Sequence, residues 1–302
     1  MNQVWVVGEV LIDLLPDGDK QKAVVGGGPA NTAVALSKLG VKAQFINGIS
    51  TDTYGKDCRQ YLENAGVLLD YVNYSNKPTC TATVTLDKEG SASYQFLIDG
   101  TSTFDYQLDQ LPDAHKLAPS LLHIGTLVCA IEPCASTLHQ WVTSFKQNVP
   151  IVYDPNIRPS VIADRNLYLK QVLRWVSLSS VVKLSLDDLN WLYPGKAVDD
   201  VANEFIGMGV RLVVVTLADA GIVAITKDEK VEVVSVKTTV VDTVGAGDTV
   251  GAIFVEAIIQ HGLEKLRGQL LIDTLNRAAA AAAITISRAG ANPPTQAELD
   301  QR

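Results

Sequence analysis

The chain has 302 residues, of which 47% are apolar, and its formal net charge is −8. A chain of this length and composition can bury a sizeable core, as one large domain or two modest ones. The negative charge disfavours nucleic acid and anionic membranes as main partners, because both attract basic surfaces.

The N-terminus and the cysteines favour a soluble, cytoplasmic protein. The first residues carry no basic segment of the kind that begins a signal peptide, and they run directly into strand-like sequence. The four cysteines form no C-x-x-C pair and show no metal-ligand spacing with the four histidines, so we expect reduced, mostly buried thiols. The alanine-rich run 278–286 is too short to cross a bilayer.

The first forty residues predict a strand, a turn and a helix. Residues 4–8 are a short apolar run that ends in glycine, typical of a strand buried on both faces. Asp13 follows in an apolar stretch, where a charge must be paired or face a cleft; a solvated aspartate at a strand end is the alternative. Three glycines at 26–28, followed by Pro29, predict a turn into a helix with Asn31 in its first turns.

A β hairpin then interrupts the pattern. A strand is expected at 45–49 and a helix at 54–65. Residues 79–86 and 91–98 have strand-like composition and flank a polar turn at 87–90, which predicts an antiparallel hairpin. Such an insertion often forms a separate small sheet, which here could serve as a lid; an edge extension of the main sheet is the alternative.

Alternating strands and helices return after residue 120. We expect strands at 121–125, 151–154, 181–185 and 212–217, and helices within 131–148 and at 167–177, 186–192, 250–260 and 270–286. Residues 221–226 and 231–236 suggest an antiparallel pair near an edge. Without linkers or repeats, the chain predicts one doubly wound α/β domain over 1–302, with a mostly parallel sheet and a β insertion.

Polar residues cluster where the predicted strands end. Ligands of such folds bind at the carboxyl ends of the strands. Arg158, after the strand 151–154, suits a phosphate or sugar hydroxyls, and a surface arginine is the alternative. Asp187 and Asp188 could reach a hydrated Mg²⁺ or could be only favourable first-turn charges. The residues at or near such ends are Asp13, Gly27, Arg158, Lys183, Thr216 and Asp248.

The stretch 241–249 carries the strongest chemical signal. Gly245-Ala246-Gly247-Asp248 lies where an alternating segment leads into a helix. The glycines allow close approach of a ligand, and the first helical turn offers unpaired N–H groups and a positive dipole end, which suits a phosphate. A carboxylate there is expected to accept a proton from a reacting group; the alternative is that Asp248 only caps the helix. Neither a P-loop nor a dinucleotide fingerprint occurs.

Two motifs together resemble the ribokinase-like (PfkB-type) carbohydrate kinases. They are 26–31 (GGGPAN) and 242–248 (DTVGAGD), about 210 residues apart, and the resemblance covers essentially the whole chain. The continuation of the first motif to Gly40 and the stretch 154–159 (DPNIRP) are more similar to fructokinases than to ribokinases.

This resemblance implies catalytic roles. Asp248 would be the base, the backbone N–H groups of Gly245, Ala246 and Gly247 would form an anion hole, and Arg158 would approach the phosphate or the sugar. The sugar would be held by Asp13, Gly27, Gly28, Asn31, Tyr94, Phe96 and Asp248. The ATP side would be lined by Asn156, Lys183, Thr216, Gly221, Gly247 and Asn276. Insertions at about 14–25 and 71–105 would form the lid.

The resemblance also implies metal ions. Mg²⁺ would accompany ATP, with Asp188 contacting it through water, because the family's N-x-x-E reads Ser185-Leu186-Asp187-Asp188 here. A monovalent cation, K⁺, would be held by Asp242 and by the residues Val244, Thr285, Arg288 and Gly290, mainly through backbone carbonyls. The family's T-L-G-A-D-G reads 216–221 (TLADAG), so a positive φ at Ala218 would strain that loop.

The leading hypothesis is an ATP-dependent kinase that converts D-fructose to fructose 6-phosphate. Ribokinase, 2-keto-3-deoxygluconate kinase and nucleoside-type kinase are alternatives within the family. Outside it, an inactive sugar or nucleotide sensor and an NAD-dependent dehydrogenase are the other hypotheses, and the latter lacks its fingerprint. The partners would be a small sugar and ATP, with no nucleic acid or membrane, and a homodimer through the lid.

Overall fold

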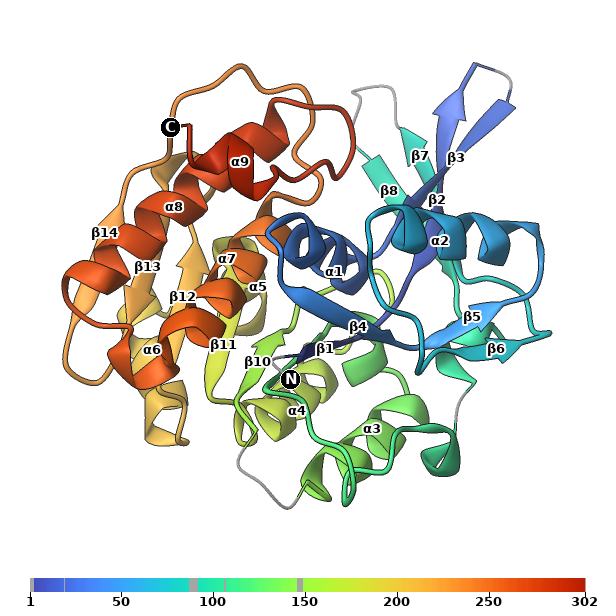
Figure 1. The fold of residues 1–302 in the computed structure, drawn as a ribbon, viewed down its shortest axis with the longest axis horizontal. Coiled ribbons are helices and arrows are strands. Elements are labelled where there is room, and N and C mark those ends of the chain that lie inside the picture. Colours follow the sequence, from blue (N-terminus) through green and yellow to red (C-terminus); the bar gives the residue numbers. More distant parts are fainter. Residues whose placement is uncertain (1–2, 19, 87–91, 106, 146–148, 302) are drawn as a thin grey trace.

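The computed structural model describes residues 3–18, 20–86, 92–105, 107–145 and 149–301. Its centre is an eight-stranded sheet in the order β14-β13-β12-β11-β10-β9-β1-β4 (Figure 1). All pairings from β4 to β12 are parallel, and β13 and β14 add an antiparallel edge, as predicted. The strands are β1 (Gln3–Val7), β4 (Lys42–Ile46), β9 (Leu121–Gly125), β10 (Ile151–Asp154), β11 (Val181–Ser185), β12 (Leu212–Thr216), β13 (Ile222–Ile225) and β14 (Lys230–Val233).

Helices cover both faces of this sheet. One face carries α1 (Gly28–Lys38), α2 (Thr53–Asn64), α7 (Ala246–His261) and α8 (Gln269–Ile286), with α9 (Gln296–Leu299) beside α8. The other carries α3 (Cys134–Thr143), α4 (Arg165–Val176), α5 (Leu186–Leu192) and α6 (Val198–Gly207). Short 3₁₀ turns complete the chain at η1 (Ser102–Phe104), η2 (Leu108–Gln110), η3 (Thr126–Cys129), η4 (Ala218–Ala220) and η5 (Leu263–Lys265).

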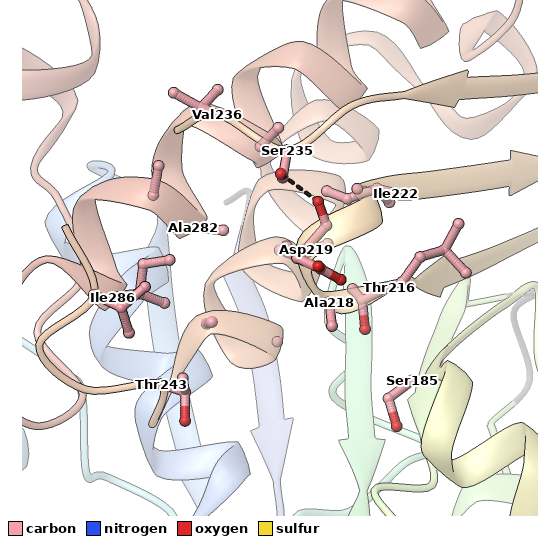
Figure 2. A pocket seen from close by; sticks show the side chains of 18 of the residues that line it. Ser185, Thr216, Ala218, Asp219, Ile222, Ser235, Val236, Thr243, Ala282 and Ile286 are labelled. Atoms are coloured by element: carbon pink, nitrogen blue, oxygen red, sulfur yellow. Dashed lines mark hydrogen bonds between the residues drawn. The ribbon is translucent and has the colours of Figure 1, made fainter. Parts of the chain in front are cut away.

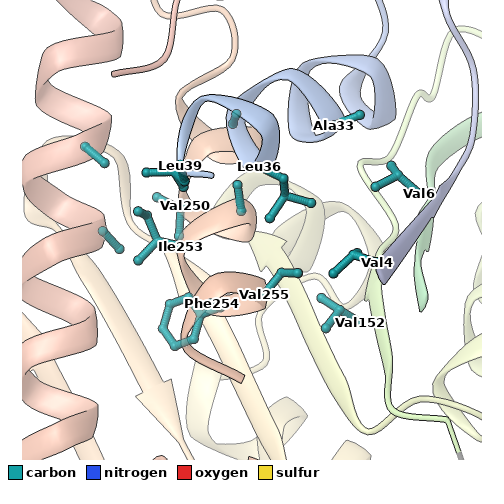
Figure 3. Close-up of a cluster of buried hydrophobic side chains, with 14 of the residues drawn as sticks. Val4, Val6, Ala33, Leu36, Leu39, Val152, Val250, Ile253, Phe254 and Val255 are labelled. Atoms are coloured by element: carbon teal, nitrogen blue, oxygen red, sulfur yellow. The ribbon is translucent and has the colours of Figure 1, made fainter. Parts of the chain in front are cut away.

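The strands are buried on both faces. In β1, Val4 and Val6 belong to the core beneath α1 and α7, while Trp5 and Val7 belong to the opposite core. This alternation explains why the parallel strands read as continuous apolar runs in the sequence. Figure 3 shows the first of these cores, where side chains of α1 and α7 lie against β1 and β10.

A separate four-stranded sheet stands beside the main one, in the order β3-β2-β7-β8. It contains β2 (Leu11–Asp17), β3 (Lys20–Gly26), β7 (Thr81–Leu86) and β8 (Ala92–Leu97), while β5 (Gly48–Ser50) pairs with β6 (Asn73–Ser75). The predicted hairpin is thus confirmed and does not extend the main sheet. Its predicted turn at 87–90 lies outside the described residues. Asp13 lies inside β2, so it is not at the end of a main-sheet strand as the sequence suggested.

Two general expectations can be compared with the structure. All four cysteines are buried, as predicted. Within the ranges given above, no helix has the length and apolar character needed to cross a membrane.

Candidate active site

The start of α7 is held in place by a fixed turn. Gly245 caps the helix in the left-handed conformation, with φ 80°, and a Cβ on it would lie 2.7 Å from the Cβ of Ala291. A side chain would therefore be strained and would clash. The carboxylate of Asp242 accepts the backbone N–H of Val244 at 3.0 Å and of Gly290 at 2.9 Å. The N–H groups of the first helical turn and the positive dipole end are features that suit an anion.

Asp248 is buried in this first turn and faces α1. Its Oδ2 accepts a hydrogen bond from Asn31 Nδ2 at 2.8 Å. Gly28 leaves room for it, since a Cβ there would lie 3.1 Å from Asp248 Oδ1 and 2.9 Å from Asn156 Nδ2. Burial raises the pKa of Asp248 to about 6, against the opposing effect of the Lys183 charge. Because the carboxylate is bonded to another helix and its pKa is raised, the arrangement favours a general base over a simple helix cap.

Arg158 carries a charge that acts on three nearby carboxyl groups. Its Nη1 donates to Asn156 Oδ1 at 2.7 Å and to the carbonyl of Ile157 at 3.0 Å, which fixes the guanidinium after β10. Its positive charge lowers the pKa values of Glu9, Asp13 and Asp248. Burial nevertheless raises the pKa of Asp13 to about 6 and that of Glu9 to about 7. A guanidinium among several carboxylates can bind phosphate and hydroxyl oxygens, while the carboxylates accept hydroxyl protons.

The small sheet contributes Asp13 to this group of carboxyls. A Cβ on Gly26 would lie 2.2 Å from Asp13 Oδ2, so only glycine allows the carboxylate to lie there. The register pairs Asp13 with Ala82 and Ala82 with Phe96, which places Asp13 and Phe96 on one face of this sheet. Tyr94 lies in β8, but its side chain is outside the described part of the chain.

Glu9, Thr126 and Asp154 belong to this region, although no sequence motif predicted a role for them. Glu9 is buried and accepts a hydrogen bond from the Oγ1 of Thr126, whose φ is 63°. The backbone oxygen of Glu9 would lie 2.5 Å from a Cβ on Gly27, which itself has φ 109°. A charge directly after the buried strand 4–8 is the signal that could have identified Glu9. Asp154 begins the stretch 154–159, but its pairing with Lys183 on the next strand is seen only in the structure.

A cavity of ≈ 700 Å³ lies between the start of α7, α8 and the strands β12 and β13 (Figure 2). Ala282 and Ile286 of α8 face Thr216 and Ala218 across it, and most of its lining is apolar. Its polar side chains include Ser185, Asp187, Thr216, Asp219, Ser235, Lys237, Thr238 and Thr243. Thr216, Gly221 and Gly247, three residues predicted for the ATP side, line this cavity.

The turn between β12 and β13 has an unusual backbone. Ala218 has φ 52°, so the predicted strain at this alanine is present. Gly221 has φ 120°, and a Cβ there would lie 2.0 Å from the carbonyl oxygen of Val233. The hydroxyl of Ser235 donates to the carbonyl of Asp219 at 2.5 Å, which closes the turn over the cavity.

Three residues predicted for the ATP side are not among the residues that line this cavity. Asn156 lies between Gly28 and Arg158, on the side of the triple-glycine loop. Lys183 is buried and paired with Asp154. Asn276 is exposed on α8, one turn before Ala279 and on the same helical face as the cavity-lining residues Ala279, Ala283 and Ile286.

The carboxylate of Asp188 is occupied by the protein itself. Its Oδ1 accepts the N–H of Ile157 at 2.7 Å, and its Oδ2 accepts the N–H and the hydroxyl of Ser185 at 3.0 and 2.7 Å. Within the residues that the structure describes, no group of three or more histidine, cysteine or acidic side chains is placed to hold a metal ion. Direct ligation of Mg²⁺ by Asp188 therefore does not fit, whereas the exposed Asp187 lines the cavity.

The turns that contain the residues predicted for a monovalent cation lie side by side. Asp242 is bonded to the N–H groups of Val244 and Gly290, and the N–H of Arg288 donates to the carbonyl of Thr285 at 3.1 Å. The Arg288 side chain turns away to an ion pair with Glu298. The hydrogen bonds of Asp242 join the two turns, and the assignment of a cation to them stays a prediction.

Several known proteins resemble this chain over most of its length. Residues 1–298 match the pfkB family of carbohydrate kinases. A fructokinase of Rhizobium leguminosarum bv. trifolii is 36% identical over 250 residues, which are 81% of this chain and 76% of that protein. The structure of a Vibrio cholerae O395 fructokinase double mutant with fructose, ADP and potassium ion is 25% identical, with TM-score 0.88 over 100% of this chain and 98% of that chain. A Xylella fastidiosa fructokinase with bound ATP shares the fold, with TM-score 0.91 at 23% identity over 99% of this chain and 97% of that chain.

Proposed function

Because this chain belongs to the pfkB family of carbohydrate kinases, we propose that it transfers the γ-phosphoryl group of ATP to a primary hydroxyl of D-fructose, giving fructose 6-phosphate. The chain is a phosphotransferase that acts on a sugar hydroxyl. The Rhizobium relative and the fructose-bound Vibrio structure support fructose as the sugar.

The position of Asp248 carries this proposal. Its carboxylate faces Asn31 and the glycine loop, whereas Ala246 and Gly247 of the same helical turn line the cavity. A sugar on the Asn31 side and a nucleotide in the cavity would meet at this turn. The phosphoryl group would then need to travel only across the start of α7.

The reaction follows from this arrangement. The sugar oxygen forms a bond to the γ-phosphorus, the bond from that phosphorus to ADP breaks, and Asp248 takes the hydroxyl proton. The N–H groups of residues 245–247 receive the oxygens of the transferring group, and Arg158 neutralises its charge. The small sheet would exclude water, which would otherwise accept the phosphoryl group.

The remaining residues would bind the sugar, the nucleotide and the ions. Asp13, Asn31 and the glycine loop would hold sugar hydroxyls, and Thr216 and Gly221 would contact the nucleotide. Mg²⁺ would arrive with ATP and neutralise phosphate charge, and Asp188 would reach it only through water. The turn of Asp242 would hold K⁺ through its carboxylate and neighbouring carbonyls.

The small sheet also suggests an assembly. In the described residues, β3 and β8 form its two outer edges, and an edge strand can pair with a second copy. We propose a homodimer through this sheet. A sedimentation mass equal to that of one chain at micromolar concentration would contradict it.

The decisive experiment is ADP release with Mg·ATP and a panel of fructose, ribose, glucose, tagatose, 2-keto-3-deoxygluconate and adenosine, each with and without K⁺. Turnover confined to fructose would support the proposal, and preference for another member of the panel would replace the sugar. Silence across the panel, with ATP still raising the melting temperature, would favour a sensor. NAD should leave the melting temperature unchanged.

A further inference from the structure

A buried ion pair lies at the carboxyl edge of the main sheet. Lys183 Nζ is 2.7 Å from Asp154 Oδ2, and the two side chains are only 6% and 4% exposed. Both residues directly follow Tyr153 and Val182, which are register partners of β10 and β11. Placing two charges out of water costs free energy that their attraction only partly offsets, so an apolar pair would be at least as stable. The ion pair therefore calls for a reason other than stability.

Lys183 lies against the first turn of α7. A Cβ on Gly247 would be 2.9 Å from Lys183 Nζ, so the ammonium packs directly on the backbone that forms the anion site. An ammonium has three N–H donors, and Asp154 takes one of them. Across the described ranges, no second acceptor is bonded to Lys183 Nζ. The charge thus lies beside Gly247 and outside the lining of the cavity.

The positive charge of Lys183 lies where it can reduce a repulsion between two negative groups. A carboxylate base beside a phosphate site repels the anion that must bind there. The groups whose charges act on Asp248 from the packed elements are Lys183 of β11, Asp154 of β10 and Arg158 after β10. The Asp248 charge in turn adds to the burial that raises the pKa values of Glu9, after β1, and Tyr61 of α2. His123 of β9 also lies under α7, but burial lowers its pKa to about 3, so it is neutral there. Lys183 lowers the pKa of Asp248 more than Asp154 raises it.

We infer that Lys183 is a positioning residue for the proposed phosphoryl transfer, a fixed positive charge behind the anion site that Asp154 holds in place. Lys183 keeps the carboxylate of Asp248 ionised and offsets its repulsion of the incoming phosphoryl group. The inference rests on the proposed function. It differs from a nucleotide contact, because the Lys183 side chain is only 6% exposed and is not among the residues that line the cavity.

The test removes both charges together. Lys183→Met alone leaves Asp154 buried without its partner and is expected to unfold more easily. The double variant Lys183→Met/Asp154→Leu replaces the pair by apolar side chains and should keep a melting temperature close to that of the wild type. The matched control is Arg277→Met/Glu256→Leu, which removes another α7 ion pair whose acid is 3% exposed, away from the proposed site.

Two measurements separate a positioning role from a structural one. For turnover, we expect the first double variant to lose about 10²-fold in kcat with little change in the KM for the sugar, and the control pair to keep its kcat. For the base, carbon-13 NMR of the aspartate carboxyls, assigned with Asp248→Asn, should show that the pKa of Asp248 rises. Asp154→Asn, which keeps an acceptor for Lys183, should move that pKa in the opposite direction.

The outcomes are distinct. A folded double variant with wild-type kcat, or an Asp248 titration that neither variant moves, would overturn the inference. If the wild type phosphorylates no sugar of the panel, the proposed function fails, while the carboxyl titration still decides the electrostatic role of Lys183. If the double variant does not fold, Lys183→Gln decides it, because glutamine can still donate to Asp154 but carries no charge: an unchanged pKa of Asp248 in that variant would overturn the inference.

Discussion

At the scale of single residues, Asp248 combines burial with a raised pKa of about 6. Asp248→Asn keeps the shape and removes the proton acceptor, so turnover should fall by several orders of magnitude while the sugar still binds. In the wild type, kcat should decline about tenfold per unit below about pH 6, because only the ionised carboxylate accepts a proton. Steady-state kinetics with fructose over pH 4.5 to 9 measure both effects.

The control for this prediction is another first-turn acid. Asp200→Asn removes an exposed carboxylate from the first turn of α6, where it acts only on the helix dipole. If Asp248 were only a helix-start charge, the two variants would behave alike. Near-normal turnover of Asp248→Asn would remove it as the base.

Ala218 is a second residue whose conformation makes a prediction. Its φ of 52° is unfavourable for any residue with a Cβ. Ala218→Gly should therefore raise the free energy of unfolding by roughly 0.5–1 kcal/mol, since the relief of strain exceeds the added freedom of the unfolded chain. Ala220→Gly in the same turn should lower it. Denaturant titrations of both variants measure the difference, and a loss in both would show that Ala218 is not strained in solution.

At the scale of elements, the main sheet was readable from the sequence and the small sheet only in part. The predicted strands 121–125, 151–154 and 181–185 have the observed bounds, because parallel strands buried on both faces are unbroken apolar runs. The predicted strand 45–49 instead spans parts of β4 and β5, which meet at Asn47, whose side chain bonds the carbonyl of Gly8. The pairing of β2 with β7 joins distant segments that no local pattern relates.

The same limit applies to the candidate site. The family motifs identified Asp248 and Asn31, whose side chains do meet. They did not fix the partners of a polar strand end: Lys183 was expected on the ATP side, and the structure shows it buried beside Gly247 and paired with Asp154. Local spacing places a residue along its strand, whereas the covering helix decides whether its side chain meets solvent or another charge.

The junction of α7 and α8 makes the element-scale prediction. Asp242 ties the turn before α7 to the turn after α8 through two backbone N–H groups, and the same turn is the proposed K⁺ site. Asp242→Ala should lower stability by about 1–2 kcal/mol and abolish the activation by K⁺, because both N–H groups lose their acceptor. Activity is measured against KCl and NaCl at constant ionic strength. Glu298→Gln, a nearby change outside this turn, should keep the K⁺ response; its loss in both variants would point to a general loosening of this region.

At the scale of the whole molecule, function and stability compete at one edge of the sheet. Burial raises the pKa of Glu9 to about 7 and those of Asp13 and Asp248 to about 6, so the folded protein holds protons there more tightly than the unfolded chain. Each such carboxyl destabilises the folded state once the pH rises through its folded pKa. The two apolar cores on either side of the sheet must offset that cost.

Glu9 offers the cleanest test of this competition. Its pKa rises from 4.5 to about 7 on folding, so its contribution to stability is lost progressively over that pH window and stays lost above it. Glu9→Gln keeps an acceptor for Thr126 and cannot ionise. The free energy of unfolding of Glu9→Gln should therefore exceed that of the wild type by roughly 1–3 kcal/mol near pH 8 and match it near pH 4.5.

Glu298→Gln is the contrasting control and should be less stable than the wild type at neutral pH. Backbone bonds from Thr295 and the hydrogen bond from Arg288 lower the pKa of Glu298 to about 2, so its carboxylate stabilises the folded protein at neutral pH. Melting temperatures of the three proteins at both pH values decide the matter: equal values for wild type and Glu9→Gln at pH 8 would mean that the Glu9 carboxylate is solvated or paired when the protein is folded.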